Sequence, residues 1–173
     1  MLVAAILVVF PFCMAFAAVS DMLSMTIANR VSLLLVGAFA VIAPLTGMDW
    51  SLYGLHFAAG LAVLAVTFTL FAVGGMGGGD AKLLAATAVW MGLGIELVEY
   101  LVFSAFIGGA LTLLLLKFRN SPVSALTGTN VFLRHFADQK AGIPYGIALG
   151  LAGLLVYPDT ALMRWAFATL AAG

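Results

Sequence analysis

Residues 52–95, LYGLHFAAGLAVLAVTFTLFAVGGMGGGDAKLLAATAVWMGLGI, place two apolar runs on either side of a glycine-rich break. The runs cover residues 52–73 and 81–95, and between them Gly74–Gly79 carries five glycines in six positions before Asp80. Long apolar runs with almost no charge are typical of helices that cross a lipid bilayer. The stretch therefore predicts two membrane helices joined by a glycine-rich turn that ends at a carboxylate.

The composition of the whole chain agrees with a membrane protein. Its 173 residues are 65% hydrophobic and 8% charged, whereas about a quarter of the residues in soluble domains are charged. The net charge is zero, so no nucleic-acid partner is expected. Cys13 is the single cysteine, and the sequence predicts neither a disulfide nor a metal site. We expect an all-α, polytopic integral membrane protein with a single membrane-embedded domain over residues 1–173.

Six membrane spans are predicted, with the N-terminus outside. They cover residues 2–19, 31–45, 52–73, 81–95, 97–116 and 143–157. The apolar tail, residues 160–173, could be an interfacial helix or an extension of the last span. With six crossings, six of the seven basic residues fall on one side, which the positive-inside rule makes cytoplasmic. Those six are Arg30, Lys82, Lys117, Arg119, Arg134 and Lys140, and Arg164 falls on the other side.

Two aspartates are expected at this cytoplasmic side. Asp21 follows the first span and Asp80 precedes the fourth. Two neighbouring carboxylates in a partly desolvated site share one proton, which is the chemistry of aspartic proteases and needs no metal. Glycines before Asp80 would let an extended substrate backbone approach and would allow turns with positive φ. The ordinary alternatives are that Asp80 is a helix N-cap and Asp21 a loop residue.

Three separated segments resemble type IV prepilin peptidases, a family that includes the archaeal preflagellin peptidases. Gly77-Gly78-Gly79-Asp80-Ala81-Lys82 resembles the family's G-x-G-D-x-K motif. The segment from Asp21 to Asn29 resembles its first catalytic segment, with Ala28 in place of the usual proline. Ile143–Ala148 resembles its Pro-Tyr-Gly segment at the start of the last span.

The resemblance implies a six-span enzyme that removes the short leader of prepilins at the cytoplasmic face, with Asp21 and Asp80 as the catalytic pair. It implies a bacterial inner-membrane location, a prepilin substrate and the pilus assembly machinery as partners, and no cofactor. The link between the first two spans is short and lacks cysteine pairs, as in the minimal form associated with tight-adherence (Flp-type) pili. No feature predicts methyl transfer. We expect the substrate cavity to be shaped by Gly77, Gly78, Gly79, Asn29, Lys82, Pro144 and Tyr145.

Two other functions compete with this interpretation. Proteases of the presenilin and signal-peptide-peptidase kind place a tyrosine before the first aspartate, where this chain has Ser20, and use a Pro-Ala-Leu segment where it has Pro144-Tyr145-Gly146. A non-enzymatic transporter or scaffold would use its carboxylates to relay ions or protons, and would tend to place them within spans. Replacing each aspartate by asparagine separates a protease from a relay.

Overall fold

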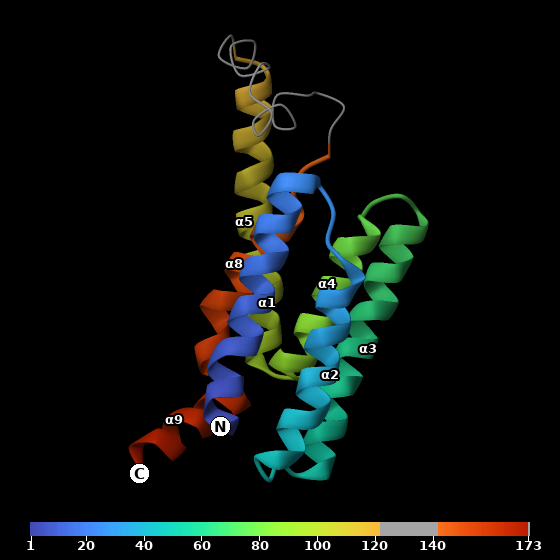
Figure 1. Ribbon diagram of the computed structural model, residues 1–173. Helices are drawn as coiled ribbons and strands as arrows, with labels where there is room; N and C mark the ends of the chain where they lie inside the picture. The colour runs from blue at the N-terminus through green and yellow to red at the C-terminus, as the bar shows by residue number, and fades with distance from the viewer. Residues whose placement is uncertain (122–141, 173) are drawn as a thin grey trace.

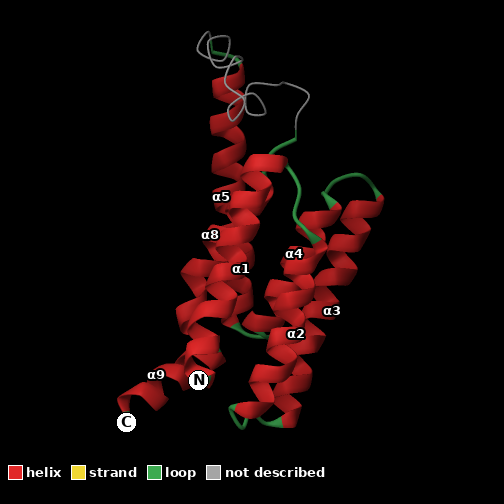
Figure 2. Ribbon diagram, viewed as in Figure 1, coloured by secondary structure: helices red, strands yellow, loops and turns green. Residues whose placement is uncertain are grey.

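The computed structural model describes residues 1–121 and 142–172, and within them every regular element is a helix (Figures 1 and 2). Helix accounts for 84% of the structure. The elements are α1 (Leu2–Ser24), α2 (Asn29–Leu45), α3 (Trp50–Ala72), α4 (Gly78–Met91), α5 (Ile95–Arg119), α8 (Tyr145–Val156), the 3-10 turn η1 (Tyr157–Asp159) and α9 (Ala161–Ala171). Each of the six predicted spans has a helical counterpart, which confirms the all-α class.

The protein is a polytopic membrane protein. Within the described residues, α1, α3 and α5 are each long and apolar enough to cross a membrane. The pair from α8 to α9 would make a fourth crossing, with a bend of 47°, and α2 is a shorter apolar helix of 17 residues. The number of crossings and the orientation stay predictions. Four polar residues of the predicted cytoplasmic loop, Arg134, His135, Asp138 and Lys140, lie outside the described residues.

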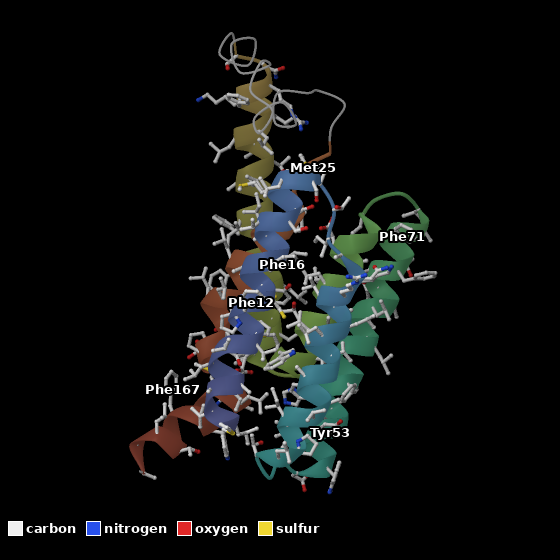
Figure 3. All side chains as sticks on the ribbon, in the orientation of Figure 1. Phe12, Phe16, Met25, Tyr53, Phe71 and Phe167 are labelled. Carbon is white, nitrogen blue, oxygen red and sulfur yellow. The ribbon has the colours of Figure 1, made fainter. Side chains whose placement is uncertain are left out.

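Helix α4 lies at the centre of the packing. Every residue of α4 from Leu83 to Met91 is buried, and the helix packs mainly against α3 and α2, with further contacts to α8 and α5. Near its C-terminal end, Trp90 donates a hydrogen bond from Nε1 to the carbonyl of Leu35 at 2.9 Å. In contrast, the large apolar side chains of Phe12 and Phe16 on α1 are exposed and point away from the bundle, as expected for a lipid-facing surface (Figure 3). The fourth predicted span is therefore surrounded by protein.

One end of the bundle gathers segments that are far apart in the sequence. The C-terminal end of α1, the start of α2, the turn between α3 and α4 and the start of α8 all lie there, and the N-terminus and α9 lie at the other end (Figure 1). Met25 at the end of α1 and Phe71 near the end of α3 mark this end, with Tyr53 towards the opposite end (Figure 3). The fold therefore brings the two sequence segments that carry Asp21 and Asp80 to the same end.

The apolar tail forms a separate helix. It follows the turn Tyr157–Asp159, and Leu162, Met163 and Ala166 of α9 are buried. Arg164 forms an ion pair with Glu96 at the start of α5, with Nη1 and Oε1 3.0 Å apart. The tail is thus attached to the rest of the bundle by both apolar and ionic contacts.

Candidate active site

Asp21 lies in the last turn of α1 and is buried. Helix α1 continues to Ser24, five residues beyond the predicted span, so Asp21 is a helical residue and not a loop residue. Its Oδ2 accepts a hydrogen bond from the backbone amide of Gly146 at 2.7 Å. A Cβ atom on Gly146 would lie 2.8 Å from Cβ of Asp21. Only glycine therefore lets the start of α8 approach this carboxylate closely enough to donate the hydrogen bond.

Asp80 lies in the first turn of α4 and is half-buried. The N-cap of α4 is Gly77, so Asp80 is not the N-cap residue. A carboxylate in the first turn of a helix is favoured by the partial positive charge of the unpaired amides. A Cβ atom on Gly77 would lie 2.8 Å from Oδ2 of Asp80. The glycine turn therefore folds directly against the carboxylate.

Glycine is needed at Gly74 and at Gly77 for different reasons. Gly74, directly after α3, has a φ of 77°, and within the described residues it is the one member of Gly74–Gly79 with positive φ. Gly77 has an ordinary extended backbone with φ of −69°. Positive φ therefore makes the turn at Gly74, whereas at Gly77 the missing side chain is what matters.

Ile27, between α1 and α2, links the surroundings of the two aspartates. A Cβ atom on Gly79 would lie 3.2 Å from Cβ of Ile27, and one on Gly146 would lie 2.9 Å from its Cδ1. Ile27 therefore packs against both the residue before Asp80 and the residue that binds Asp21. The hydropathy of the sequence does not single out Ile27, although it lies within the Asp21–Asn29 segment.

The two carboxylates are close enough to interact electrostatically. Asp80 lies just before the predicted span at residues 81–95. Burial of its side chain and the negative charge of Asp21 raise the pKa of Asp80 from 3.8 to about 7. Loss of hydration disfavours the charged form of a carboxylate, and a second negative charge nearby disfavours it further. At neutral pH this arrangement can supply one protonated and one ionised carboxyl group.

A cavity of about 330 Å³ adjoins Asp80. Its lining residues are Gly75, Met76, Gly77, Asp80, Ile143 and Tyr145. The hydroxyl of Tyr145 donates a hydrogen bond to the carbonyl of Ser104 on α5 at 3.1 Å, which fixes the ring at the edge of the cavity. Asp21 is 5% exposed and lies outside this lining. Asp80 is therefore the carboxylate that a molecule in the cavity would contact.

The remaining residues predicted to bind substrate fall into separate groups. Gly77 and Tyr145 line the cavity beside Asp80. Gly78 and Gly79 belong to the first turn of α4, and Pro144 is the buried N-cap of α8. Asn29 and Lys82 line a different cavity, between α2, α3 and α4, where Nζ of Lys82 donates to Oδ1 of Asn29 at 3.0 Å. Within the described residues, no group of three His, Cys, Asp or Glu side chains is placed to hold a metal ion.

Comparison with known families identifies a family for this chain. The model of the type IV leader peptidase family matches residues 8–118, more than half of the chain. The matched region contains Asp21, Asp80 and the glycine turn, whereas Pro144-Tyr145-Gly146 lies beyond it. Comparison with curated proteins finds no match, and comparison with solved structures finds none either.

Proposed function

The chain belongs to the type IV leader peptidase family, and from this premise we propose that it is an aspartyl endopeptidase whose catalytic residues are Asp21 and Asp80. Membership of the family makes it a membrane-embedded prepilin leader peptidase. We further propose that it acts at the cytoplasmic face and that its substrates are prepilins of the tight-adherence (Flp) type. No metal or cofactor takes part in the proposed reaction.

The observation that carries the catalytic assignment is the convergence of the two aspartates, 59 positions apart in the sequence, at one end of the bundle. Asp21 accepts an amide hydrogen bond from Gly146 at Oδ2, so this oxygen acts as an acceptor. Asp80 is buried enough, and close enough to Asp21, for its pKa to rise to about 7. The surroundings of the two carboxyl groups therefore differ, as they must if one group is to act as the acid and the other as the base.

In the proposed mechanism, ionised Asp21 takes a proton from a water molecule as its oxygen attacks the scissile carbonyl carbon. Protonated Asp80 donates its proton towards the carbonyl oxygen, and a tetrahedral gem-diol results. Asp21 then returns its proton to the amide nitrogen while Asp80 takes one back from the gem-diol. The C–N bond breaks, the leader leaves with a carboxyl terminus and the mature pilin with an amino terminus. Both carboxyl groups end in their starting protonation states.

The proposed substrate path follows from the cavity beside Asp80. The backbone of the cleavage site would extend along Gly75 and Gly77 and under the ring of Tyr145, all of which line this cavity. The apolar helix of the prepilin would stay in the bilayer, and its leader would remain in the cytoplasm. Because glycine has no side chain, Gly75 and Gly77 leave room for a peptide backbone in extended conformation.

The test is cleavage of a purified Flp-type prepilin by the full chain reconstituted in lipid. Asp21→Asn and Asp80→Asn should each lower the cleavage rate by about 10²–10⁴-fold, because each variant removes one partner of the acid–base pair. Asp49→Asn, at the other end of the bundle, is the matched control and should cleave at the wild-type rate. Full processing by both site variants would contradict a protease and favour a transporter or scaffold.

A further inference from the structure

A second and larger cavity, of about 470 Å³, lies between α2, α3 and α4, away from the proposed peptidase site. Its walls are mainly apolar and include Val36 on α2 with Phe57, Leu61 and Leu64 on α3. Leu61 is 67% exposed, so the cavity is open towards the surface that we expect lipid to cover. Neither Asp21 nor Asp80 lines it. We call it the α2–α4 groove.

The polar groups of the α2–α4 groove all lie at one end. Lys82 and Asn29, which form a hydrogen bond to each other, lie near the starts of α4 and α2. One turn further along α2, Ser32 is 9% exposed, and its Oγ has no hydrogen-bond partner among the described residues. A buried hydroxyl without a partner is costly, so an occupant with an acceptor at that depth would be favoured.

The shape of the groove matches the upper part of one membrane lipid. Its lining runs from residue 29 to 36 on α2, from 57 to 64 on α3 and from 82 to 89 on α4, which is about 10.5 Å along each axis. A cationic and polar end therefore leads into an apolar length that opens towards the surface where we expect lipid. A headgroup followed by an acyl chain has the same order of polar and apolar parts.

We propose that the α2–α4 groove binds one phospholipid with an anionic headgroup. The headgroup phosphate pairs with the ammonium of Lys82, and an acyl-ester carbonyl one turn deeper accepts a hydrogen bond from Ser32. The acyl chain lies along Val36, Leu61 and Leu64. A cation at the polar end selects a negative headgroup over a zwitterionic one, since a nearby opposite charge lowers the energy of the anion. This site does not depend on which peptide is cleaved.

The location of the groove gives such a lipid a structural connection to the proposed peptidase site. Lys82 follows Asp80 by two residues, and Asn29 follows Ile27 by two. A lipid held between Lys82 and the start of α2 would therefore stabilise the contact of Ile27 with the first turn of α4. Delipidation would loosen the segments around both carboxylates.

The test uses the full chain in nanodiscs with photoreactive phospholipids that carry a diazirine on one acyl chain. A phosphatidylglycerol probe should form adducts on groove residues of α2 and α3, several-fold more than the matched phosphatidylcholine probe. Lys82→Gln should reduce this headgroup preference to within about twofold, whereas Lys117→Gln, which removes another exposed lysine, should retain it. Leu61→Trp should lower groove adducts with both probes, whereas Leu55→Trp, exposed on the same helix but outside the groove, should not.

Three results would overturn the proposal. The first is adducts spread over all lipid-facing helices with no enrichment in the groove. The second is an unchanged headgroup preference in Lys82→Gln, which remains informative even if Leu61→Trp fails to fold. The third is labelling of the groove by a prepilin peptide, with a photoreactive residue in its apolar segment, that displaces the lipid adducts. The peptidase assignment is tested separately by the aspartate variants and survives each of these results.

Discussion

At the scale of single residues, Asp21 and Asp80 have different surroundings. Asp21 is buried and accepts the amide hydrogen bond of Gly146, whereas Asp80 borders a cavity and has a pKa raised to about 7 by burial and by the charge of Asp21. Unequal surroundings are what separates the roles of two chemically identical groups. Asp80 therefore suits the role of the protonated partner and Asp21 that of the base.

The first residue-scale prediction concerns the pH dependence of cleavage. The active form carries one proton on the pair, so the rate should fall as pH rises through about 7, when Asp80 ionises. It should also fall in acid, when the second carboxylate is protonated. The two apparent pKa values belong to the pair and not to either residue. Initial rates of prepilin cleavage from pH 4 to 9 would check this, and a flat profile from pH 5 to 9 would contradict it.

The second residue-scale prediction concerns stability. The pKa of Asp80 is raised in the folded protein, so between pH 4 and 7 the folded state binds more protons than the unfolded state. The contribution of Asp80 to stability is therefore fully present at pH values below the pKa of this carboxyl group in the unfolded chain. It is lost as the pH rises through about 7. Asp80→Asn removes the charge and should increase the free energy of unfolding at pH 8 by on the order of 1 kcal/mol, with no gain at pH 4. Thermal unfolding in detergent at both pH values measures the difference.

Asp49 provides the opposite case as a control. Its side chain accepts hydrogen bonds from the hydroxyl and amide of Ser51, and these bonds lower its pKa. Because the pKa of this carboxyl group is lower in the folded protein than in the unfolded chain, its ionised form stabilises the fold at pH values above its pKa in the unfolded chain. This stabilisation is lost as the pH falls. Asp49→Asn should therefore reduce stability at pH 8 and not below pH 4. An equal response of both variants at pH 8 would show that the effect is not specific to the site.

At the scale of elements, the sequence predicts the helices well and their ends less well. Every predicted span has a helical counterpart, because long apolar runs leave few alternatives to a helix in lipid. Helix α1 continues past residue 19 because its next residues contain no glycine or proline, and Ser24 donates a hydrogen bond to the carbonyl of Ser20 at 2.7 Å. Helix α4 starts within the glycines, at Gly78, although glycine disfavours helix. It ends at Met91, and its C-cap is Gly92, whose φ is 77°.

The candidate site, too, could be predicted only in part from the sequence. The two aspartates could be chosen from the sequence because each lies in a recognisable segment at the predicted cytoplasmic side. The hydrogen bond from Gly146 to Asp21 joins residues 125 positions apart, and the packing of Ile27 between Gly79 and Gly146 depends on three elements. Such contacts depend on how helices pack, which hydropathy and spacing do not specify. The separation of Asn29 and Lys82 from the cavity beside Asp80 was not foreseen for the same reason.

The element-scale prediction uses two neighbouring glycines of α5. A Cβ atom on Gly108 would lie 2.2 Å from Cε2 of Tyr145, whereas one on Gly109 would meet nothing within 4 Å. Gly108→Ala should displace the Tyr145 ring, break its bond to Ser104 and lower the cleavage rate by about tenfold or more. Gly109→Ala adds the same methyl group to open space and should cleave normally. Equal activity of the two variants would mean that the ring of Tyr145 has no part in the site.

At the scale of the whole molecule, the helices form two groups. One contains α1, α5 and α8, and the other contains α2, α3 and α4, with the groups joined through α1 and α2 and through α4 and α8 (Figure 1). Asp21 belongs to the first group and Asp80 to the second. The proposed site therefore lies where the groups meet, and a small shift of one group against the other changes the spacing of the carboxylates. A site between two groups of helices can open for a peptide without the unfolding of any helix.

The whole-molecule prediction concerns orientation in the membrane. Most basic residues lie on one predicted side, and the segments that carry the two aspartates lie at one end of the bundle, where Asp21 acts electrostatically on Asp80. If that end is cytoplasmic, a cysteine replacing Lys117 should react with a membrane-impermeant maleimide only after the cells are lysed. A cysteine replacing Trp50, which is 73% exposed at the other end, should react in intact cells. Cys13 is buried and gives little background, and the unsubstituted chain is the control. Because the leader of a prepilin must meet both aspartates, labelling in the reverse pattern would put the proposed site on the wrong side of the membrane for cytoplasmic cleavage.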